Sequence, residues 1–194
     1  MGVVLAGGRS ERFGSADKLA ADFRGMPLLH HAVLHLAEVC PLVVVVAAEG
    51  GSDPQLPPGV PVVVAHDAAP DQGPLSGLLG GLTEAAGADL LLVAGGDMPD
   101  LRTPVLLEML KVAAEADVDA VALQDGPRIS PLPCVLRAAA AAGAAHALLH
   151  EGERSLRALL RSLRTAVVDE AAWTALDPER GTLFDVDLPE HLIR

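Results

Sequence analysis

Basic residues are scarce in this chain. Its 194 residues hold 14 Lys and Arg against 26 Asp and Glu, which gives a formal net charge of −12. A protein with this balance repels polyanions through its overall field, which excludes non-specific binding to nucleic acid or to an anionic membrane surface as a function. An anionic small molecule must then be held by local cations, so each Lys or Arg near a candidate site is informative.

Cysteines and long apolar runs are also few. Cys40 and Cys134 lie far apart in the sequence, without a CxxC pair or a histidine at zinc-ligand spacing. This pattern argues against a structural zinc site and indicates a reduced, cytoplasmic protein. No apolar run is long enough to span a bilayer, and Met1 is followed directly by an apolar segment, so we expect neither a transmembrane helix nor a signal peptide.

Two common phosphate-binding motifs are missing as well. The P-loop requires Gly directly before its Lys and Ser or Thr after it, whereas Lys18 is preceded by Asp17 and followed by Leu19. The dinucleotide fingerprint GxGxxG is absent too, which argues against an oxidoreductase. A different kind of phosphate site is therefore needed to explain the glycines and cations near the N-terminus.

That stretch reads VVLAGGRSERFGSADK over residues 3–18. The apolar residues 2–5 predict a buried strand, which breaks into Gly7 and Gly8. Two adjacent glycines let backbone N–H groups approach a ligand because no Cβ intervenes. Arg12 and Lys18 bring cations to the same place. The combination predicts a polyphosphate site, and the alternative is an ordinary Gly-rich turn between strand and helix.

These residues resemble the LAGGxSxRxGxxK signature of nucleotidyltransferases, with one extra residue before the Lys. The matching positions are Leu5, Ala6, Gly7, Gly8, Ser10, Arg12, Gly14 and Lys18. The double Gly after Leu-Ala is similar to the molybdenum cofactor guanylyltransferase family, whereas cytidylyltransferases and many sugar nucleotidyltransferases tend towards LAAG. The resemblance implies that residues 5–8 hold a triphosphate, that Lys18 and Arg12 are catalytic, and that Mg²⁺ is the cofactor.

Apolar runs of about five residues alternate with helical patterns along most of the chain. The expected strands are residues 42–47, 60–65, 90–94 and 118–123, and the expected helices are residues 27–39, 74–86 and 104–116. This alternation predicts an α/β fold, with one doubly wound three-layer domain over residues 1–194 and a mostly parallel central sheet. The resemblance implies a nucleotide-diphospho-sugar transferase-like version of this fold. Ligands bind at the carboxyl ends of such strands.

The remaining segments are less regular. Residues 129–136 read as a strand despite Pro131 and Pro133, which predicts an edge strand or a bulge. Residues 19–23 read as a short strand before a turn at Arg24 and Gly25. Helices are expected at residues 137–149 and 153–163, a strand at 165–169, and a short helix near Trp173.

Asp97 follows the predicted strand 90–94 within the segment GGDMP. Its carboxylate is thereby delivered to the same edge of the sheet as the glycine loop. Mg²⁺ takes one or two protein carboxylates and completes its shell with phosphates and water, so we expect Asp97 to be the metal ligand and a catalytic residue. The resemblance agrees, since the family places a metal-binding Asp after a core strand. The alternative is an Asp that caps a turn or a helix.

Residues 66–77 read HDAAPDQGPLSG, similar to a D…GPLxG segment that lies against the nucleotide in the family. The matching positions are Asp67, Gly73, Pro74, Leu75 and Gly77. Guanine presents adjacent N1–H and N2–H₂ donors that a carboxylate can accept, so we assign Asp67 to guanosine binding, with Asp71 as a rival. The alternative is a loop and helix start with Pro74 as the first helical residue.

Asp185 and Asp187 lie in a segment that resembles the family's Asn-x-Asn-Thr-Pro-Glu, with Asp at both Asn positions. Two residues at i and i+2 of an extended segment point to the same side, so either carboxylate is a candidate second metal ligand. The change from Asn removes the amide donors that the family motif would offer to a ligand.

Arg154 lies in a Gly-Glu-Arg segment that matches the same family, and the resemblance implies that it binds ligand. Arg157, Arg161 and Arg164 follow at helical spacing along one stripe. This stripe could dock an anionic second substrate or simply be a solvated basic face. Arg128 is a further candidate contact for the acceptor.

The resemblance implies a reaction in which GTP donates a guanylyl group to the terminal phosphate of the molybdenum cofactor and pyrophosphate is released. It also implies cofactor-donor and acceptor enzymes as partners. Three rivals stay open. The nearest is another nucleotidyltransferase, using CTP with the same cofactor or transferring guanylyl to a phospho-acid or sugar phosphate. The second is a nucleotide-binding regulator or chaperone without turnover, which the presence of both Lys18 and Asp97 disfavours. The third is an oxidoreductase on a similar sheet, against which the lack of GxGxxG argues.

Overall fold

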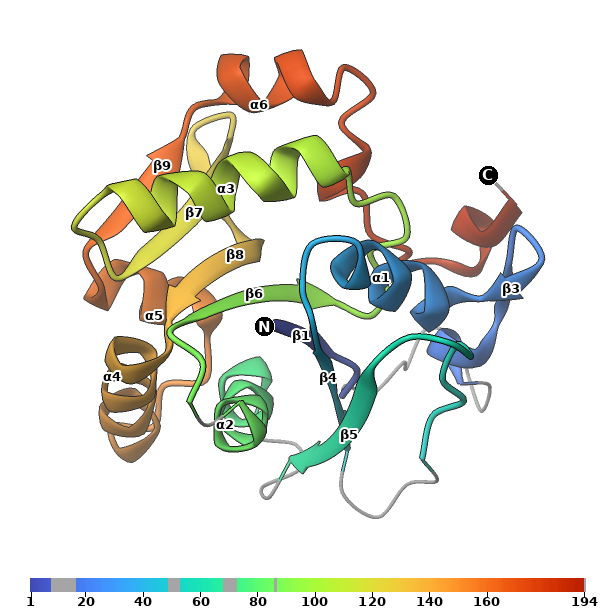
Figure 1. Cartoon of the computed structure of the whole chain (residues 1–194), viewed down its shortest axis with the longest axis horizontal. Coiled ribbons are helices and arrows are strands. Elements are labelled where there is room, and N and C mark those ends of the chain that lie inside the picture. The colour runs from blue at the N-terminus through green and yellow to red at the C-terminus, as the bar shows by residue number, and fades with distance from the viewer. Residues whose placement is uncertain (8–16, 49–52, 68–72, 86, 194) are drawn as a thin grey trace.

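A central sheet organises the molecule (Figure 1). The computed structural model describes residues 1–7, 17–48, 53–67, 73–85 and 87–193. Within these ranges the sheet has seven strands in the order β5-β4-β1-β6-β8-β7-β9. Their bounds are β1 (Gly2–Leu5), β4 (Val43–Ala48), β5 (Val62–Asp67), β6 (Leu90–Gly95), β7 (Ala120–Asp125), β8 (Arg128–Arg137) and β9 (Thr165–Val168).

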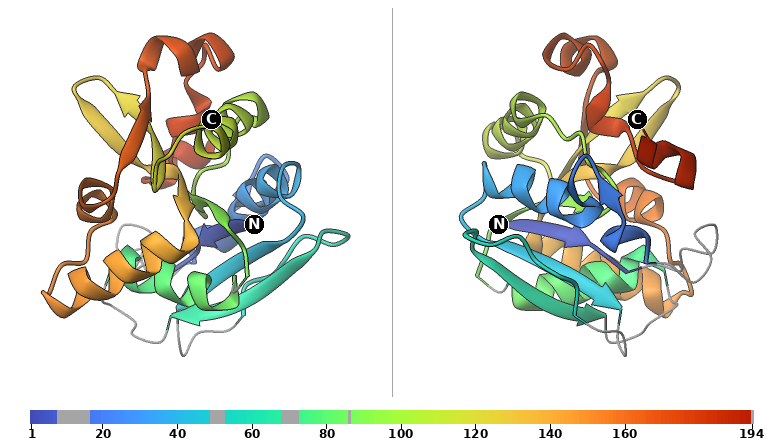
Figure 2. Two further views of the ribbon diagram at one scale, coloured as in Figure 1. Left: turned by 60° about the vertical axis from the view of Figure 1, so that its left-hand side comes forward. Right: turned by 90° about the vertical axis from the view of Figure 1, so that its right-hand side faces the viewer.

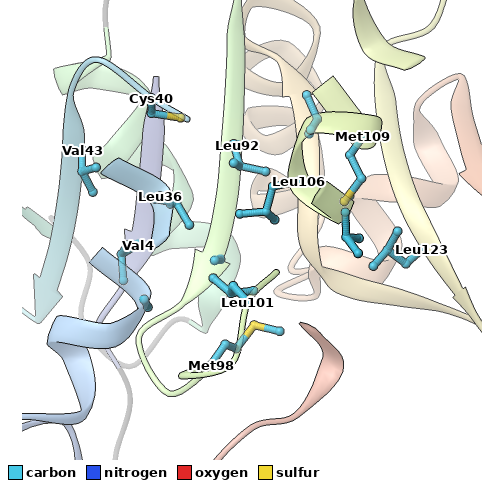
Figure 3. Packing of buried hydrophobic residues seen from close by; sticks show 14 of the residues in the cluster. Val4, Leu36, Cys40, Val43, Leu92, Met98, Leu101, Leu106, Met109 and Leu123 are labelled. Carbon is cyan, nitrogen blue, oxygen red and sulfur yellow. The ribbon is translucent and has the colours of Figure 1, made fainter. Parts of the chain in front are cut away.

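Helices cover both faces of this sheet (Figure 2). On one face lie α1 (Leu28–Ala37), α3 (Thr103–Glu115) and α6 (Glu170–Leu176), and on the other lie α2 (Pro74–Glu84), α4 (Ala138–His150) and α5 (Leu156–Ser162). Successive strand residues alternate between the two cores, so Val4 packs into the first and Val3 into the second. Figure 3 shows part of the first core, where Leu92 of β6 and Met109 of α3 are buried. The expected three-layer α/β architecture is confirmed.

Most strand pairs are parallel. β1 pairs in parallel with β4 and β6, β4 with β5, and β7 with β9. In this register Leu5 lies between Val46 and Gly95. The carboxyl ends of β1, β4 and β6 therefore meet at one edge of the sheet, which is where such folds bind ligands.

β8 is the exception, and its predicted edge position is wrong. It lies between β6 and β7 and runs antiparallel to both. Pro131 and Pro133 are tolerated because the ladder with β6 ends at Cys134, and the ladder with β7 shifts register between Ala122 and Gln124. The prolines thus fall at a bulge, the second position that the sequence suggested, where no ladder N–H is needed.

A small hairpin follows the glycine loop. Residues 19–23 form only partly the strand that the sequence suggested, because the 3₁₀ turn η2 (Lys18–Ala20) precedes a two-residue strand β2 (Asp22–Phe23). β2 pairs with β3 (Met26–Pro27) across a turn in which Arg24 and Gly25 have φ of 53° and 87°. Positive φ at both central residues suits the twist of a tight hairpin.

The C-terminal segment passes beside this hairpin (Figures 1 and 2). It contains the 3₁₀ turns η3 (Gly181–Leu183) and η4 (Pro189–Ile193). Val186 is fully buried against Phe23 and Leu28, which fixes the segment next to the start of α1. Among the helices of the described ranges, none combines the length and the apolar character needed to cross a lipid bilayer.

Candidate active site

The end of β1 opens into a polar edge. The N–H of Ala6 donates to the carbonyl of Val46 at 2.8 Å, and the carbonyl of Leu5 accepts from the N–H of Gly96 at 3.0 Å. Gly7 is the first exposed residue. Among the described residues, a Cβ at Gly7 would contact only the Ala48 nitrogen, at 3.8 Å, so none of them crowds the backbone of Gly7. Gly8, Arg12 and Gly14 lie outside the described residues.

Lys18 meets Asp97 at this edge. The ammonium Nζ lies 2.7 Å from Oδ2 of Asp97 and 3.7 Å from Oδ1 of Asp187. The Lys18 side chain is 11% exposed, Asp97 30% and Asp187 52%, so the cation is largely enclosed while the carboxylates still face outward. Carboxylates 79 and 169 positions further along the chain are therefore brought to one cation, and the sequence predicted this convergence for Lys18 and Asp97.

The glycines before Asp97 permit this geometry. A Cβ at Gly95 would lie 2.6 Å from Oδ1 of Asp97, so any larger residue there would push the carboxylate away. Leu19, the residue after Lys18, packs over Gly96, and a Cβ at Gly96 would lie 3.2 Å from its side chain. The two glycines thus allow η2 to lie against the Asp97 loop, with Lys18 in ion-pair contact.

The acidic C-terminal pair joins the same cluster. The N–H of Val186 donates to the carbonyl of Asp97 at 2.9 Å, and its buried side chain leaves Asp185 and Asp187 on the opposite side of the extended segment. The pKa of Asp185 is raised, mainly because the carboxyl group is partly buried and also because the negative charges of Asp187 and Asp97 lie near it. Three carboxylates therefore share one neighbourhood with Lys18.

This cluster is not a finished metal site. In the described residues no three His, Cys, Asp or Glu side chains converge as ligands. Asp97 and Asp187 nevertheless both lie within 4 Å of one cation, the Lys18 ammonium. A hard ion that keeps water and phosphate ligands needs only one or two carboxylates, so the donor set fits Mg²⁺ when it binds together with a phosphate.

Asp67 lies at the end of β5 and is buried, at 8% exposure. Its Oδ1 accepts a hydrogen bond from the Ser76 hydroxyl at 2.6 Å, and its Oδ2 lies 3.8 Å from where a Cβ of Gly77 would be. The carboxylate therefore joins β5 to the first turn of α2. Its assignment to the guanine base stays a prediction.

The other matches in this segment shape the start of α2. Pro74 begins the helix, as the sequence suggested, and Leu75 is wholly buried in the core. Gly73 has φ of 82°, and a Cβ there would lie 3.0 Å from the Cβ of Arg154 and 3.2 Å from its carbonyl oxygen. Only glycine fits that position, because both the dihedral angle and the close approach exclude a side chain.

Arg154 is anchored to the backbone around it. Its Nη1 donates to the carbonyls of Leu149 and Glu153, both at 3.1 Å, and its own carbonyl accepts from the Leu75 N–H at 3.4 Å. Hydrogen bonds from the N–H groups of Arg154 and Ser155 lower the pKa of Glu153. The Gly-Glu-Arg segment thus ties α5 to α2, and the binding of ligand by Arg154 stays a prediction.

The arginine stripe is shorter than the sequence suggested. Arg157 and Arg161 are exposed on α5, whereas Arg164 lies beyond the helix end at Ser162. Its guanidinium group pairs with Asp117 at 2.8 Å and Asp119 at 2.9 Å, at the opposite end of the sheet from the Lys18 cluster. Arg164 is therefore not part of a common basic face with the other two.

Comparison with known proteins agrees with this geometry. Residues 2–167 match the family model described as a MobA-like NTP transferase domain. A molybdenum cofactor guanylyltransferase of Xanthomonas euvesicatoria is 36% identical over 196 aligned positions, which cover 100% of this chain and 92% of the relative. The chain belongs to the MobA-like NTP transferase family.

Solved structures show the same fold. Molybdopterin-guanine dinucleotide biosynthesis protein A from Archaeoglobus fulgidus has a TM-score of 0.76 at 21% identity, with 100% of this chain and 96% of that chain covered. The 2-C-methyl-D-erythritol 4-phosphate cytidylyltransferase from Thermus thermophilus has a TM-score of 0.69 at 17% identity, with 98% and 94% covered. The expected nucleotidyltransferase architecture is thereby confirmed.

In this MobA-like chain, sequence reasoning missed several residues that support the site. Ser76 as the partner of Asp67, Gly95 and Gly96 as the space for Asp97, and the Arg24 pair with Asp100 were not foreseen. The Gly-Gly-Asp run contained a signal for the glycines, because two glycines before a functional Asp indicate close approach. The ion pair between Arg24 and Asp100, 76 positions apart, leaves no local pattern.

Proposed function

We propose that this protein transfers a guanylyl group from GTP to the terminal phosphate of the molybdenum cofactor. A phosphate oxygen of the acceptor attacks the α-phosphorus, the bond from that phosphorus to the bridging oxygen breaks, and pyrophosphate leaves with the electron pair. The product is a guanine dinucleotide. Full-length similarity to a guanylyltransferase supports the assignment.

The observation that carries the proposal is the contact between Lys18 and Asp97 beside Gly7. It gathers a cation, a carboxylate and an open glycine backbone at the carboxyl edge of the sheet. Attack by a phosphate needs no protein nucleophile, so catalysis consists of positioning and charge neutralisation. Lys18 neutralises charge on the triphosphate, Gly7 and Gly8 hold its oxygens, and Arg12 is expected to assist the leaving pyrophosphate.

We assign Mg²⁺ to Asp97, with Asp187 or Asp185 as the second carboxylate. Bound there, the ion would supply a Lewis acid for α- and β-phosphate oxygens. The residues themselves set up this site: Gly95 leaves room for the carboxylate of Asp97, and Val186 holds the C-terminal acids against the Asp97 loop.

Base recognition is proposed for the end of β5. Asp67 is buried against Ser76, so in this proposal its charge and hydrogen bond also fix the first turn of α2, against which the nucleoside lies. Gly73, Pro74, Leu75 and Gly77 give that turn its shape, and Arg154 holds it from the other side.

We further propose that residues 1–194 form one catalytic domain that works in the cytoplasm, with the enzymes that deliver and receive the cofactor as partners. Cys40 and Cys134 are both free and buried, which suits a reducing compartment. Burial raises the pKa of the Cys134 thiol to about 12, so it stays an unreactive thiol at neutral pH.

The test is pyrophosphate release by the purified protein with molybdopterin and each of the four nucleoside triphosphates, with Mg²⁺ present. We expect turnover with GTP that depends on molybdopterin. Turnover with CTP, or with a phospho-acid or sugar phosphate as acceptor, would identify another nucleotidyltransferase. Nucleotide binding without pyrophosphate release would indicate a regulator and contradict the proposal.

A further inference from the structure

A pocket lies outside the cluster around Lys18. It has a volume of about 430 Å³ and sits between the turn that leads into β8 and the helix α5. Its lining combines three cations with three apolar side chains: Arg128, Arg157 and Arg161 with Pro127, Ile129 and Leu160. The volume is within the usual range for small-molecule sites.

The three arginines of this pocket differ from the others. Within the described ranges, none of their guanidinium groups makes a hydrogen bond or ion pair with another residue. Every other described arginine donates to a carboxylate or carbonyl; these are Arg24, Arg102, Arg137, Arg154, Arg164 and Arg180. The charge of Arg161 also acts on Glu153 through space. In a chain of net charge −12, three neighbouring arginines without a hydrogen-bonded or ion-paired partner among the described residues indicate an external anion.

The strand register places this pocket on the reactive side of the sheet. β8 is antiparallel to β6, with Cys134 opposite Val93. The residues of β8 before Cys134 therefore run past the carboxyl end of β6, where Asp97 lies. α5 packs under β8, and the segment before α5 contacts the start of α2. The pocket thus borders the same edge as the Lys18 cluster.

The order along the sheet separates two binding regions. Groups assigned to the nucleotide follow β1 and β5, and Asp97 follows β6, the next strand after β1. The pocket flanks β8 on the other side of β6. An acceptor whose phosphate reaches Asp97 from the side opposite the nucleotide would place its remaining part towards this pocket.

We propose that the pocket binds the body of the acceptor substrate, a planar heteroaromatic molecule with anionic groups, while its phosphate reaches Asp97. The inference rests on the proposed function. Guanidinium groups stack on planar rings and pair with oxyanions, and Ile129 and Leu160 supply an apolar floor. A concave, partly apolar site of this size suits a small molecule better than the acidic surface of a protein, which would meet a flatter patch.

The test measures acceptor binding separately from turnover. Molybdopterin is titrated without GTP into the wild-type protein and into Arg128→Ala, Arg157→Ala and Arg161→Ala by calorimetry, and steady-state kinetics then give KM for each substrate. We expect each variant to weaken molybdopterin binding and raise its KM about tenfold or more, with the KM for GTP changed less than twofold. Arg157→Lys should recover part of the loss, because the charge remains.

Arg164→Ala is the matched control. It removes the same charge two residues beyond α5 but lies outside the pocket and should leave both KM values unchanged. The inference would be overturned if all three pocket variants bound molybdopterin as the wild type does and had the same KM for it. It would also be overturned if these variants bound a cofactor-carrying protein more weakly while their molybdopterin binding stayed unchanged. Absence of GTP turnover in the wild-type protein would instead contradict the proposed function, and the binding titration would still decide the pocket.

Discussion

At the scale of single residues, Lys18 carries most of the proposed chemistry. Lys18→Met should lower guanylyl transfer by about 10² to 10⁴, because the ammonium that neutralises the triphosphate is removed. Pyrophosphate release under saturating GTP measures this. Lys111→Met is the matched control, since Lys111 is exposed on α3 and its ion pair among the described residues is with Glu108, across one helical turn. Activity above a tenth of wild type in Lys18→Met would contradict the assigned role.

Gly95 tests whether the position of Asp97 matters. Gly95→Ala places a Cβ 2.6 Å from Oδ1 of Asp97, so the carboxylate must move and kcat should fall about 10²-fold. Gly143→Ala is the control, because a Cβ there meets nothing within 4 Å in the middle of α4. That variant should keep full activity and be slightly more stable. Equal activities of the two variants would show that the Asp97 geometry is not critical.

The sequence predicted the meeting of Lys18 and Asp97 better than the contacts of the residues around them. Lys18 and Asp97 were identified because a glycine loop and a strand end each place a side chain at the sheet edge, and both patterns are local. The partners of Asp67 and Arg154 were not predictable, since Ser76 and the carbonyl of Leu149 bind them only once α2 and α4 are packed. Asp67 is buried because α2 packs against the end of β5, and no local sequence pattern indicates this contact.

At the scale of elements, the junction between α2 and the segment before α5 depends on Gly73. In Gly73→Ala, the new side chain is strained by the φ of 82°, and its Cβ would lie 3.0 Å from the Cβ of Arg154. The free energy of unfolding should therefore fall by about 3 kcal/mol. Gly59→Ala has a similar φ of 80° but open space, and it separates dihedral strain from the clash. Urea unfolding measures both. If the two variants lose the same stability, the contact with Arg154 has no energetic role.

α1 holds the Asp97 loop through His35, whose Nε2–H donates to the carbonyl of Pro99 at 3.1 Å. Burial lowers the pKa of His35. The unfolded chain then binds more protons than the folded protein below about pH 6.5, so stability is lost as the pH falls through that range.

His35→Gln keeps a donor but cannot titrate. Its unfolding free energy should fall less between pH 7.5 and pH 5.5 than that of the wild type, by up to about 1.4 kcal/mol per pH unit. Urea unfolding at the two pH values gives the comparison. His146→Gln, an exposed change on α4, should retain the wild-type slope. A wild-type slope in His35→Gln would mean that other groups cause the acid sensitivity.

Element boundaries were predictable where periodicity was strong. Continuous apolar runs, rich in Val for β4 and in Leu for β6, predicted these strands because strands covered on both faces have no polar side. For β8 the prolines predicted an edge strand or a bulge, and the structure has a central strand with the bulge, at the register shift of β7. Such a shift depends on the partner strand, which the sequence of β8 does not contain.

At the scale of the whole molecule, the site gathers parts of the chain from β1, the β6 loop and the C-terminal segment around one cation. The Lys18 ammonium lies between Asp97 and Asp187, close to where the proposal places a metal ion. Mg²⁺ must therefore compete with the ammonium, unless a triphosphate offers Lys18 other oxygens. This arrangement couples metal binding to nucleotide binding.

The coupling predicts that Mg²⁺ or GTP alone shifts the melting temperature little, while the two together raise it by more than the sum. A ligand that binds only the folded protein stabilises it by RT ln(1 + [L]/Kd), so the melting temperature reports each affinity. Lys18→Met is the decisive variant. Without the ammonium, Mg²⁺ alone should bind more tightly than to the wild type, and its coupling to GTP should shrink. If Mg²⁺ alone binds the wild type as tightly as it does with GTP present, Lys18 does not compete with the metal.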